Sequence, residues 1–184
     1  MREISLFIAM SLDGYIADDE GGVGWLGGQG DDNCDFDAYS LFIKDIDAII
    51  MGWNTYRQVT EELAPGAWPY DAQTTYVITH RDMPLITHRD MPSSDKVRFV
   101  NMHPAQLAAQ LRAQSGGGIW VCGGANVCRQ LIDADMIDRY YITVIPTLLG
   151  SGIRLFEGGQ ERKLRLIETR AYDGMVDIVY RRRV

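Results

Sequence analysis

No stretch of this 184-residue sequence is apolar over the roughly 20 residues that a membrane-spanning helix needs. A signal peptide is not expected either, because the apolar run after Met1 breaks at Asp13-Gly14 without a small-residue cleavage site. We therefore expect no membrane partner. Apolar residues nevertheless make up 46% of the chain, which is enough for a packed core. We expect one domain over residues 1–184.

Cysteine and histidine are scarce. The three cysteines, Cys34, Cys122 and Cys128, form no C-x-x-C pair, and this odd count favours reduced thiols and a cytoplasmic location. The three histidines show no metal-ligand spacing, so we predict no metal site. Cys122 and Cys128 have apolar neighbours and are expected to be small buried side chains.

Basic residues are too few for general nucleic-acid binding. Lys and Arg number 18 against 25 Asp and Glu, which gives a net charge of −7 and predicts no nucleic-acid partner. The excess of acid lies in residues 1–71, with 14 acidic and 3 basic side chains; residues 72–184 carry 11 acidic and 15 basic ones. An anionic ligand would therefore find its counter-charges in the later part. A solvated surface without a ligand is the alternative.

Short apolar segments alternate with amphipathic ones along the chain. We expect strands at 4–10, 45–51, 75–79, 96–100, 119–122 and 139–145, and helices at 36–43, 55–59, 104–114 and 126–133. Segments 164–172 and 175–182 flank Asp173-Gly174, which is typical of a hairpin. This order predicts an α/β fold of three layers, with helices on both faces of a mainly parallel sheet that the hairpin extends with antiparallel strands.

One segment is duplicated. The residues Ile-Thr-His-Arg-Asp-Met-Pro occur at 78–84 and again, unchanged, at 86–92. Two copies are too few for a folded repeat array. We expect the second copy to lengthen a surface loop, because such insertions cost little loop-closure entropy.

Two glycine turns each stand between a predicted strand and a predicted helix. Gly123-Gly124 and Gly52 both allow a close backbone approach, and the helix N-terminus that follows attracts an anion. Thr55 lies where its hydroxyl could bind a phosphate oxygen. Because the carboxyl ends of parallel strands meet at one edge, the two turns predict one phosphate-binding edge. A tight turn at Gly123-Gly124 and a helix cap at Thr55 are the alternatives.

Four segments, in order and at compatible spacing, resemble the dihydrofolate reductase superfamily. They are Ser11-Leu-Asp-Gly-Tyr-Ile-Ala, Met51-Gly-x-x-Thr-Tyr, Gly123-Gly124 and Pro146-x-Leu-Leu-Gly-x-Gly-x-x-Leu-Phe. The chain is most similar to the reductase domain of the bifunctional riboflavin-biosynthesis enzyme and to its stand-alone relatives. This resemblance implies a dihydrofolate-reductase-like fold, a homodimer, and NADPH-dependent hydride transfer to a small heterocycle of the pteridine or pyrimidine type. A non-catalytic nucleotide- or flavin-binding protein on the same scaffold is the alternative.

The resemblance also implies which residues hold the cofactor, NADPH or NADH. They are Ala9, Ile16, Gly52, Trp53, Thr55, Thr79, His80, Arg81, Gly123, Gly124, Ala125, Asn126 and Val127. Trp53 departs from the family, which usually has an arginine there for the 2′-phosphate; a tryptophan stacks on adenine but neutralises no charge. We therefore predict that Arg81 binds the 2′-phosphate, with Arg89 of the second copy as the alternative.

Candidates for the substrate lie near the first predicted helix. The family places a carboxylate at the start of that helix, and Asp35 and Asp37 both lie there, with Asp37 the better candidate. Either could bind the amidine-like edge of a heterocycle, and helix capping is the alternative. Trp25 and the loop 17–32 are predicted to close over the site as a lid, with loop packing as the alternative. Hydride chemistry belongs to the cofactor, so no nucleophile is needed.

Overall fold

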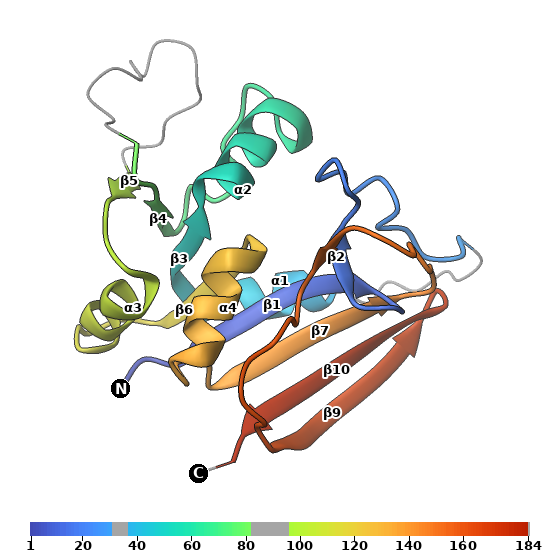
Figure 1. Ribbon diagram of the computed structural model, residues 1–184. Coiled ribbons are helices and arrows are strands. Elements are labelled where there is room, and N and C mark those ends of the chain that lie inside the picture. The colour runs from blue at the N-terminus through green and yellow to red at the C-terminus, as the bar shows by residue number, and fades with distance from the viewer. Residues whose placement is uncertain (31–36, 82–95, 184) are drawn as a thin grey trace.

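The computed structural model describes residues 1–30, 37–81 and 96–183. Its centre is an eight-stranded sheet with the strand order β5-β4-β3-β6-β1-β7-β10-β9 (Figure 1). Neighbouring strands from β5 to β7 run parallel, while β10 and β9 are antiparallel to their neighbours. The strands are β1 (Ile4–Ser11), β3 (Ile46–Gly52), β4 (Thr74–Ile78), β5 (Val97–Val100), β6 (Gly118–Gly123), β7 (Arg139–Ile145), β9 (Leu164–Tyr172) and β10 (Met175–Arg182). The predicted α/β fold is confirmed.

Helices cover both faces of this sheet. On one face lie α3 (Pro104–Arg112) and α4 (Ala125–Asp133), and on the other lie α1 (Ala38–Ile43) and α2 (Trp53–Gln58), which continues as the π-helix η1 (Val59–Leu63). A separate hydrophobic cluster fills each face. Neighbours on β1 divide between them, since Leu6 joins the cluster with α3 and α4 and Phe7 packs against the other. The continuous apolar run of β1 therefore reflects burial on both faces.

A small second sheet was not expected from the sequence. It pairs β2 (Tyr15–Ala17) with β8 (Ile153–Arg154) in antiparallel orientation. Gly152 precedes β8 with a φ of 137°, and a Cβ there would lie 2.3 Å from the Ala17 carbonyl oxygen, so only glycine fits. Strands this short carry no readable alternation. The pairing brings the Pro146–Phe156 segment beside the end of β1.

The helix expected over 55–59 is longer in the structure. It begins at Trp53, directly after Gly52, and runs through η1 to Leu63 before Pro65. Cys34, Asp35, Arg89 and the whole second copy of the duplicated segment lie outside the described residues. Cys128 is buried, as predicted, and Cys122 is half-buried. No helix in the described ranges is long and apolar enough to cross a membrane.

Candidate active site

The two glycine turns meet at the carboxyl ends of neighbouring strands. β3 and β6 are parallel partners, and Met51 lies opposite Gly123. Gly123 has a φ of 144°, which favours glycine, and its peptide bond to Gly124 is cis. A Cβ built on Gly124 would lie 3.2 Å from Thr55 Oγ1, so the Thr55 hydroxyl packs directly on the Gly123-Gly124 backbone. The expected convergence of both turns at one edge of the sheet is therefore present.

Each turn leads into a helix whose first backbone N–H groups are available. Gly52 is the N-cap of α2 and Gly124 is the N-cap of α4, and within the described residues no side chain donates or accepts a capping bond at either end. Such helix ends carry free N–H groups and partial positive charge. Together they can bind an extended anion such as a pyrophosphate.

These helix ends line a cleft of about 1510 Å³. All thirteen residues predicted to hold the cofactor are on its wall: Ala9, Ile16, Gly52, Trp53, Thr55, Thr79, His80, Arg81, Gly123, Gly124, Ala125, Asn126 and Val127. They come from β1, β2, β3, β6, the loop after β4 and the helices α2 and α4, yet they line one cleft. Their contact with a cofactor stays a prediction.

One end of the cleft is aromatic and basic. The Arg81 guanidinium carbon lies 5.3 Å from the centre of the Trp53 ring, and the Trp53 ring itself packs at 6.2 Å from Phe99. Beside them, His80 Nδ1 and Asn101 Oδ1 are 3.0 Å apart. Trp53 is therefore not the only side chain available to a ligand at this end of the cleft, because the Arg81 guanidinium lies over its ring. An adenine ring and a phosphate would both find partners there.

The opposite wall of the cleft includes residues that the sequence reasoning did not single out. The Arg154 guanidinium stacks 4.4 Å from the centre of the Tyr15 ring, and its Nη2 donates to the Tyr15 hydroxyl at 2.8 Å. Asp13 fastens this wall, since its carboxylate accepts hydrogen bonds from the Ser11 hydroxyl at 2.6 Å and from the Gly150 amide at 2.7 Å. These bonds, the Ser11 hydroxyl first, lower the pKa of Asp13 to about 2. No local pattern in the sequence marks the Arg154–Tyr15 pair, because only the β2–β8 pairing joins them.

Cys122 lines the floor of the cleft, one residue before Gly123. Burial raises the pKa of its thiol to about 12, so the thiol stays protonated and is a poor nucleophile. The same burial raises the pKa of the neighbouring Tyr70 hydroxyl. This part of the cleft is neutral and apolar, which suits a bound ring better than a covalent step.

Asp37 lies elsewhere. It is the N-cap of α1, where its carboxylate accepts hydrogen bonds from the Ser40 amide at 3.0 Å and from the Ser40 hydroxyl. These bonds lower the pKa of Asp37, and the side chain is exposed. Asp37 is not among the residues that line the cleft. The structure thus shows the capping role that was the alternative for Asp37, and Asp35 falls outside the described residues.

Trp25 also lies outside the cleft wall. Its indole nitrogen donates to the Gly22 carbonyl at 3.3 Å within its own loop, which is the packing role named as the alternative. The loop does border the cleft through Val23 and Leu26. The bonds that hold it include one from Gln58 Nε2 to the Gly21 carbonyl at 2.8 Å and one from the Gln29 amide to the Asp173 carbonyl at 2.9 Å. A lid role for Trp25 stays a prediction.

No cluster of three or more His, Cys, Asp or Glu side chains suited to a metal ion occurs within residues 1–30, 37–81 and 96–183.

Comparison with known proteins shows the family to which the chain belongs. A family model described as the RibD C-terminal domain matches residues 2–179. The chain belongs to the RibD C-terminal domain family. The predicted resemblance is confirmed, and the fold of this RibD C-terminal domain is dihydrofolate-reductase-like.

Similar proteins span nearly the whole RibD C-terminal domain. The uncharacterized protein YwjB of Bacillus subtilis (strain 168) is 38% identical over 183 residues, with 97% of each chain covered. The structure of a putative riboflavin biosynthesis protein from Shewanella sp. PV-4 is 26% identical, with 99% of each chain covered and a TM-score of 0.83. A pyrimidine reductase-like protein from Corynebacterium diphtheriae is 18% identical and shares the fold, with a TM-score of 0.68, over all of this chain and 92% of that one. This last likeness shows a shared fold.

Proposed function

We propose that this protein is a NAD(P)H-dependent reductase that transfers hydride to a small heterocycle of the pteridine or pyrimidine type. One observation carries the proposal: two helix N-termini without side-chain caps, at Gly52 and Gly124, open side by side into one cleft. A dinucleotide pyrophosphate is the anion that such a paired site fits. The family membership supports the proposal, because the family is that of the RibD reductase domain.

The residues present fit this cofactor. A side chain at Gly124 would crowd Thr55 and fill the cradle, and glycine leaves it open to a phosphate. Backbone N–H groups of Ala125 to Val127 and the Thr55 hydroxyl would hold the pyrophosphate, while backbone groups of Ala9 and Ile16 would orient the nicotinamide. When bound, the cofactor supplies the hydride. The protonated Cys122 thiol would add no charge at the reacting end.

A titration and a turnover assay test this function. We expect NADPH to quench the fluorescence of the tryptophans, and we expect NADPH absorbance to fall when a reducible member of a pterin and pyrimidine panel is present. Thr55→Val should weaken NADPH binding about tenfold, the loss expected for one hydrogen bond to a charged group. Thr60→Val is the matched control, because the Thr60 hydroxyl is buried and donates to the Tyr56 carbonyl at 3.1 Å within the same helical run.

Three results would contradict the proposal. If neither NADPH nor NADH quenches the tryptophan fluorescence, the protein does not bind a nicotinamide cofactor. Quenching without oxidation across the whole panel indicates a nucleotide-binding protein that lacks turnover. A purified protein that is yellow with bound flavin indicates a flavin-binding relative.

A further inference from the structure

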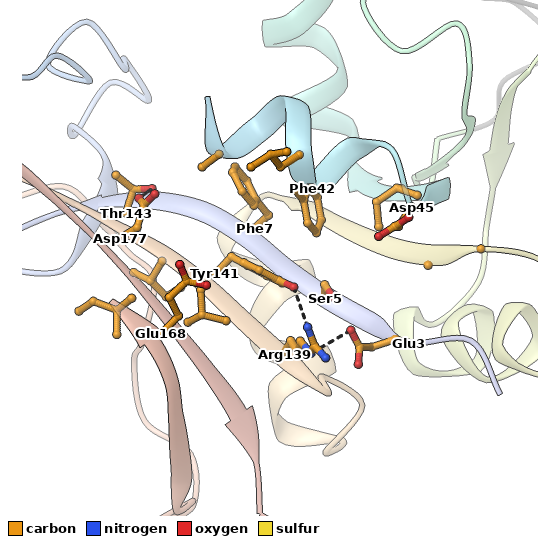
Figure 2. A pocket seen from close by; sticks show the side chains of 18 of the residues that line it. Glu3, Ser5, Phe7, Phe42, Asp45, Arg139, Tyr141, Thr143, Glu168 and Asp177 are labelled. Atoms are coloured by element: carbon orange, nitrogen blue, oxygen red, sulfur yellow. Dashed lines mark hydrogen bonds and ion pairs between the residues drawn. The ribbon is translucent and has the colours of Figure 1, made fainter. Parts of the chain in front are cut away.

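The arginine–tyrosine pair on the cleft wall, Arg154 with Tyr15, differs from the pair in a smaller pocket of about 540 Å³ on the α1 face of the sheet. Figure 2 shows that second pair: Arg139 Nη1 donates to the Tyr141 hydroxyl at 3.2 Å, and its Nε lies 3.1 Å from a Glu3 carboxylate oxygen. Arg154 has no such acid, because its partners in the described part of the chain are the Tyr15 ring, the Tyr15 hydroxyl and one backbone carbonyl. Neutralising a carboxylate therefore does not explain Arg154.

Arg154 and Tyr15 join two strands that are too short to hold each other firmly. β2 has three residues and β8 has two. An ordinary strand has about five to six. Tyr15 and Arg154 are opposite one another in the pairing of these strands, and the guanidinium both stacks on the ring and donates to its hydroxyl. The two side chains therefore add the rigidity that so short a main-chain pairing lacks.

The Tyr15 hydroxyl extends these contacts to the loop before β8. It accepts from Arg154 and donates to the Gly150 carbonyl at 3.2 Å, and Arg154 Nη1 also donates to the Asp13 carbonyl at 3.3 Å. Tyr15 is only 6% exposed, and a cation on a desolvated ring is held more strongly than one on a ring in water. We call Tyr15, Arg154 and the Gly150 carbonyl the β2–β8 clasp. This clasp ties β2, the β1–β2 turn and the loop before β8 into one unit.

The β2–β8 clasp lies next to Ile16, which lines the cleft. Ile16 is the predicted backbone neighbour of the nicotinamide, and the residues on either side of it, Tyr15 and Ala17, are both buried and both paired with β8. The Gly52 and Gly124 turns, which would hold the pyrophosphate, follow β3 and β6 of the other sheet. The clasp therefore acts on one end of the cofactor site and leaves the other end unchanged.

We propose that Arg154 and Tyr15 are positioning residues that fix the Ile16 backbone at the reacting end, so that they control the rate of hydride transfer and not the strength of cofactor binding. This inference rests on the proposed reductase function and adds residues that orient the reacting ring. A misplacement of about 1 Å can slow a reaction by about 100-fold. Arginine suits this task, because its planar guanidinium stacks on the ring and donates to the hydroxyl together, which the ammonium of lysine does not.

The first test needs no cofactor. Hydrogen–deuterium exchange of the full chain, followed at the amides of residues 15–17, measures how firmly β2 is held. We expect exchange there to be at least about tenfold faster in Arg154→Met and in Arg154→Lys, and to rise less in Tyr15→Phe, which keeps the ring and loses the hydroxyl. Arg98→Met is the matched control, because Arg98 stacks on Tyr76 outside the cleft. Its exchange at residues 15–17 should equal that of the wild type.

The second test separates binding from rate. We expect the NADPH dissociation constant of Arg154→Met, measured by tryptophan quenching, to stay within about twofold of the wild type, because the pyrophosphate turns are intact. The rate of hydride transfer in a single turnover with a reducible member of the pterin and pyrimidine panel should fall at least about tenfold. A general loss of folding would lower affinity and rate together, so this split identifies positioning.

The outcomes separate this inference from the reductase function. Faster exchange in Arg154→Met, with affinity retained and transfer slowed, supports the clasp. Exchange equal to the wild type in Arg154→Met overturns it, and so does a loss of NADPH affinity that Arg154→Lys restores, because Arg154 would then bind an anionic group. A wild type that neither binds NADPH nor turns over removes the reductase function, and the exchange data still decide whether the clasp fixes Ile16. Should Arg154→Met fail to fold, Tyr15→Phe decides, and unchanged exchange there overturns the inference.

Discussion

Arg81 is the residue on which we predict coenzyme selectivity to depend. Its guanidinium lies over Trp53, and its backbone amide donates to the Thr79 hydroxyl at 3.1 Å. We expect Arg81→Ala to weaken NADPH binding by about tenfold or more and to leave NADH binding unchanged, because only NADPH presents a 2′-phosphate to the guanidinium. Parallel titrations with the two coenzymes measure this difference.

Arg98→Ala is the control for Arg81. Arg98 also stacks on an aromatic ring, 5.7 Å from the centre of Tyr76, but it does not line the cleft. Its removal should affect neither coenzyme. Equal losses for NADPH and NADH in Arg81→Ala would show that the 2′-phosphate is bound elsewhere.

Asp37 and Asp177 show which features of a single residue can be recognised from the sequence. Asp37 could be marked from the sequence because it stands before a helical pattern, and the same local signal describes a helix cap. Asp177 stands in the apolar run of β10, where an isolated carboxylate is unusual, but its partners Thr143 and Tyr172 become visible only through strand pairing. Residues joined by cross-strand register leave no local pattern, so sequence reasoning could mark Asp37 but not the Asp177 cluster.

At the scale of elements, Asp13 joins the β1–β2 turn to the loop before β8. Its pKa is lowered to about 2 from a usual value near 3.8, so the native state is stabilised by the charged carboxylate. That contribution is present above about pH 4 and is lost as the pH falls toward 2. Asp13→Asn should therefore unfold at lower urea concentration than the wild type at pH 6, and the difference should shrink between pH 4 and pH 2.

Urea titrations at a series of pH values measure this. Asp71→Asn, at an exposed acid on the loop before β4, is the matched control and should follow the wild type. If Asp13→Asn and the wild type lose stability in parallel from pH 4 to pH 2, the Asp13 carboxylate is not what holds the two loops together.

The secondary-structure elements differ in how far their own sequence determines them. The hairpin strands run over Leu164–Tyr172 and Met175–Arg182, as expected. Their turn could be predicted because Asp and Gly favour the positive φ that Asp173 and Gly174 adopt there. The β2–β8 sheet could not be foreseen, because its short strands are stable only after distant loops meet. The convergence of the two glycine turns could be predicted, since glycine turns after buried strands are local signals and parallel strand ends share an edge.

At the scale of the whole molecule, a ligand that binds only the folded state must raise its thermal stability. With NADPH at 100 times its dissociation constant, the gain is about 2.7 kcal/mol. For a chain of this length that corresponds to about 5–10 °C in Tm. Thr55→Val, if it binds tenfold more weakly, should gain only about 1.4 kcal/mol at the same concentration and shift by about half as much. Differential scanning calorimetry measures both shifts, and equal shifts would mean that Thr55 does not contact the cofactor.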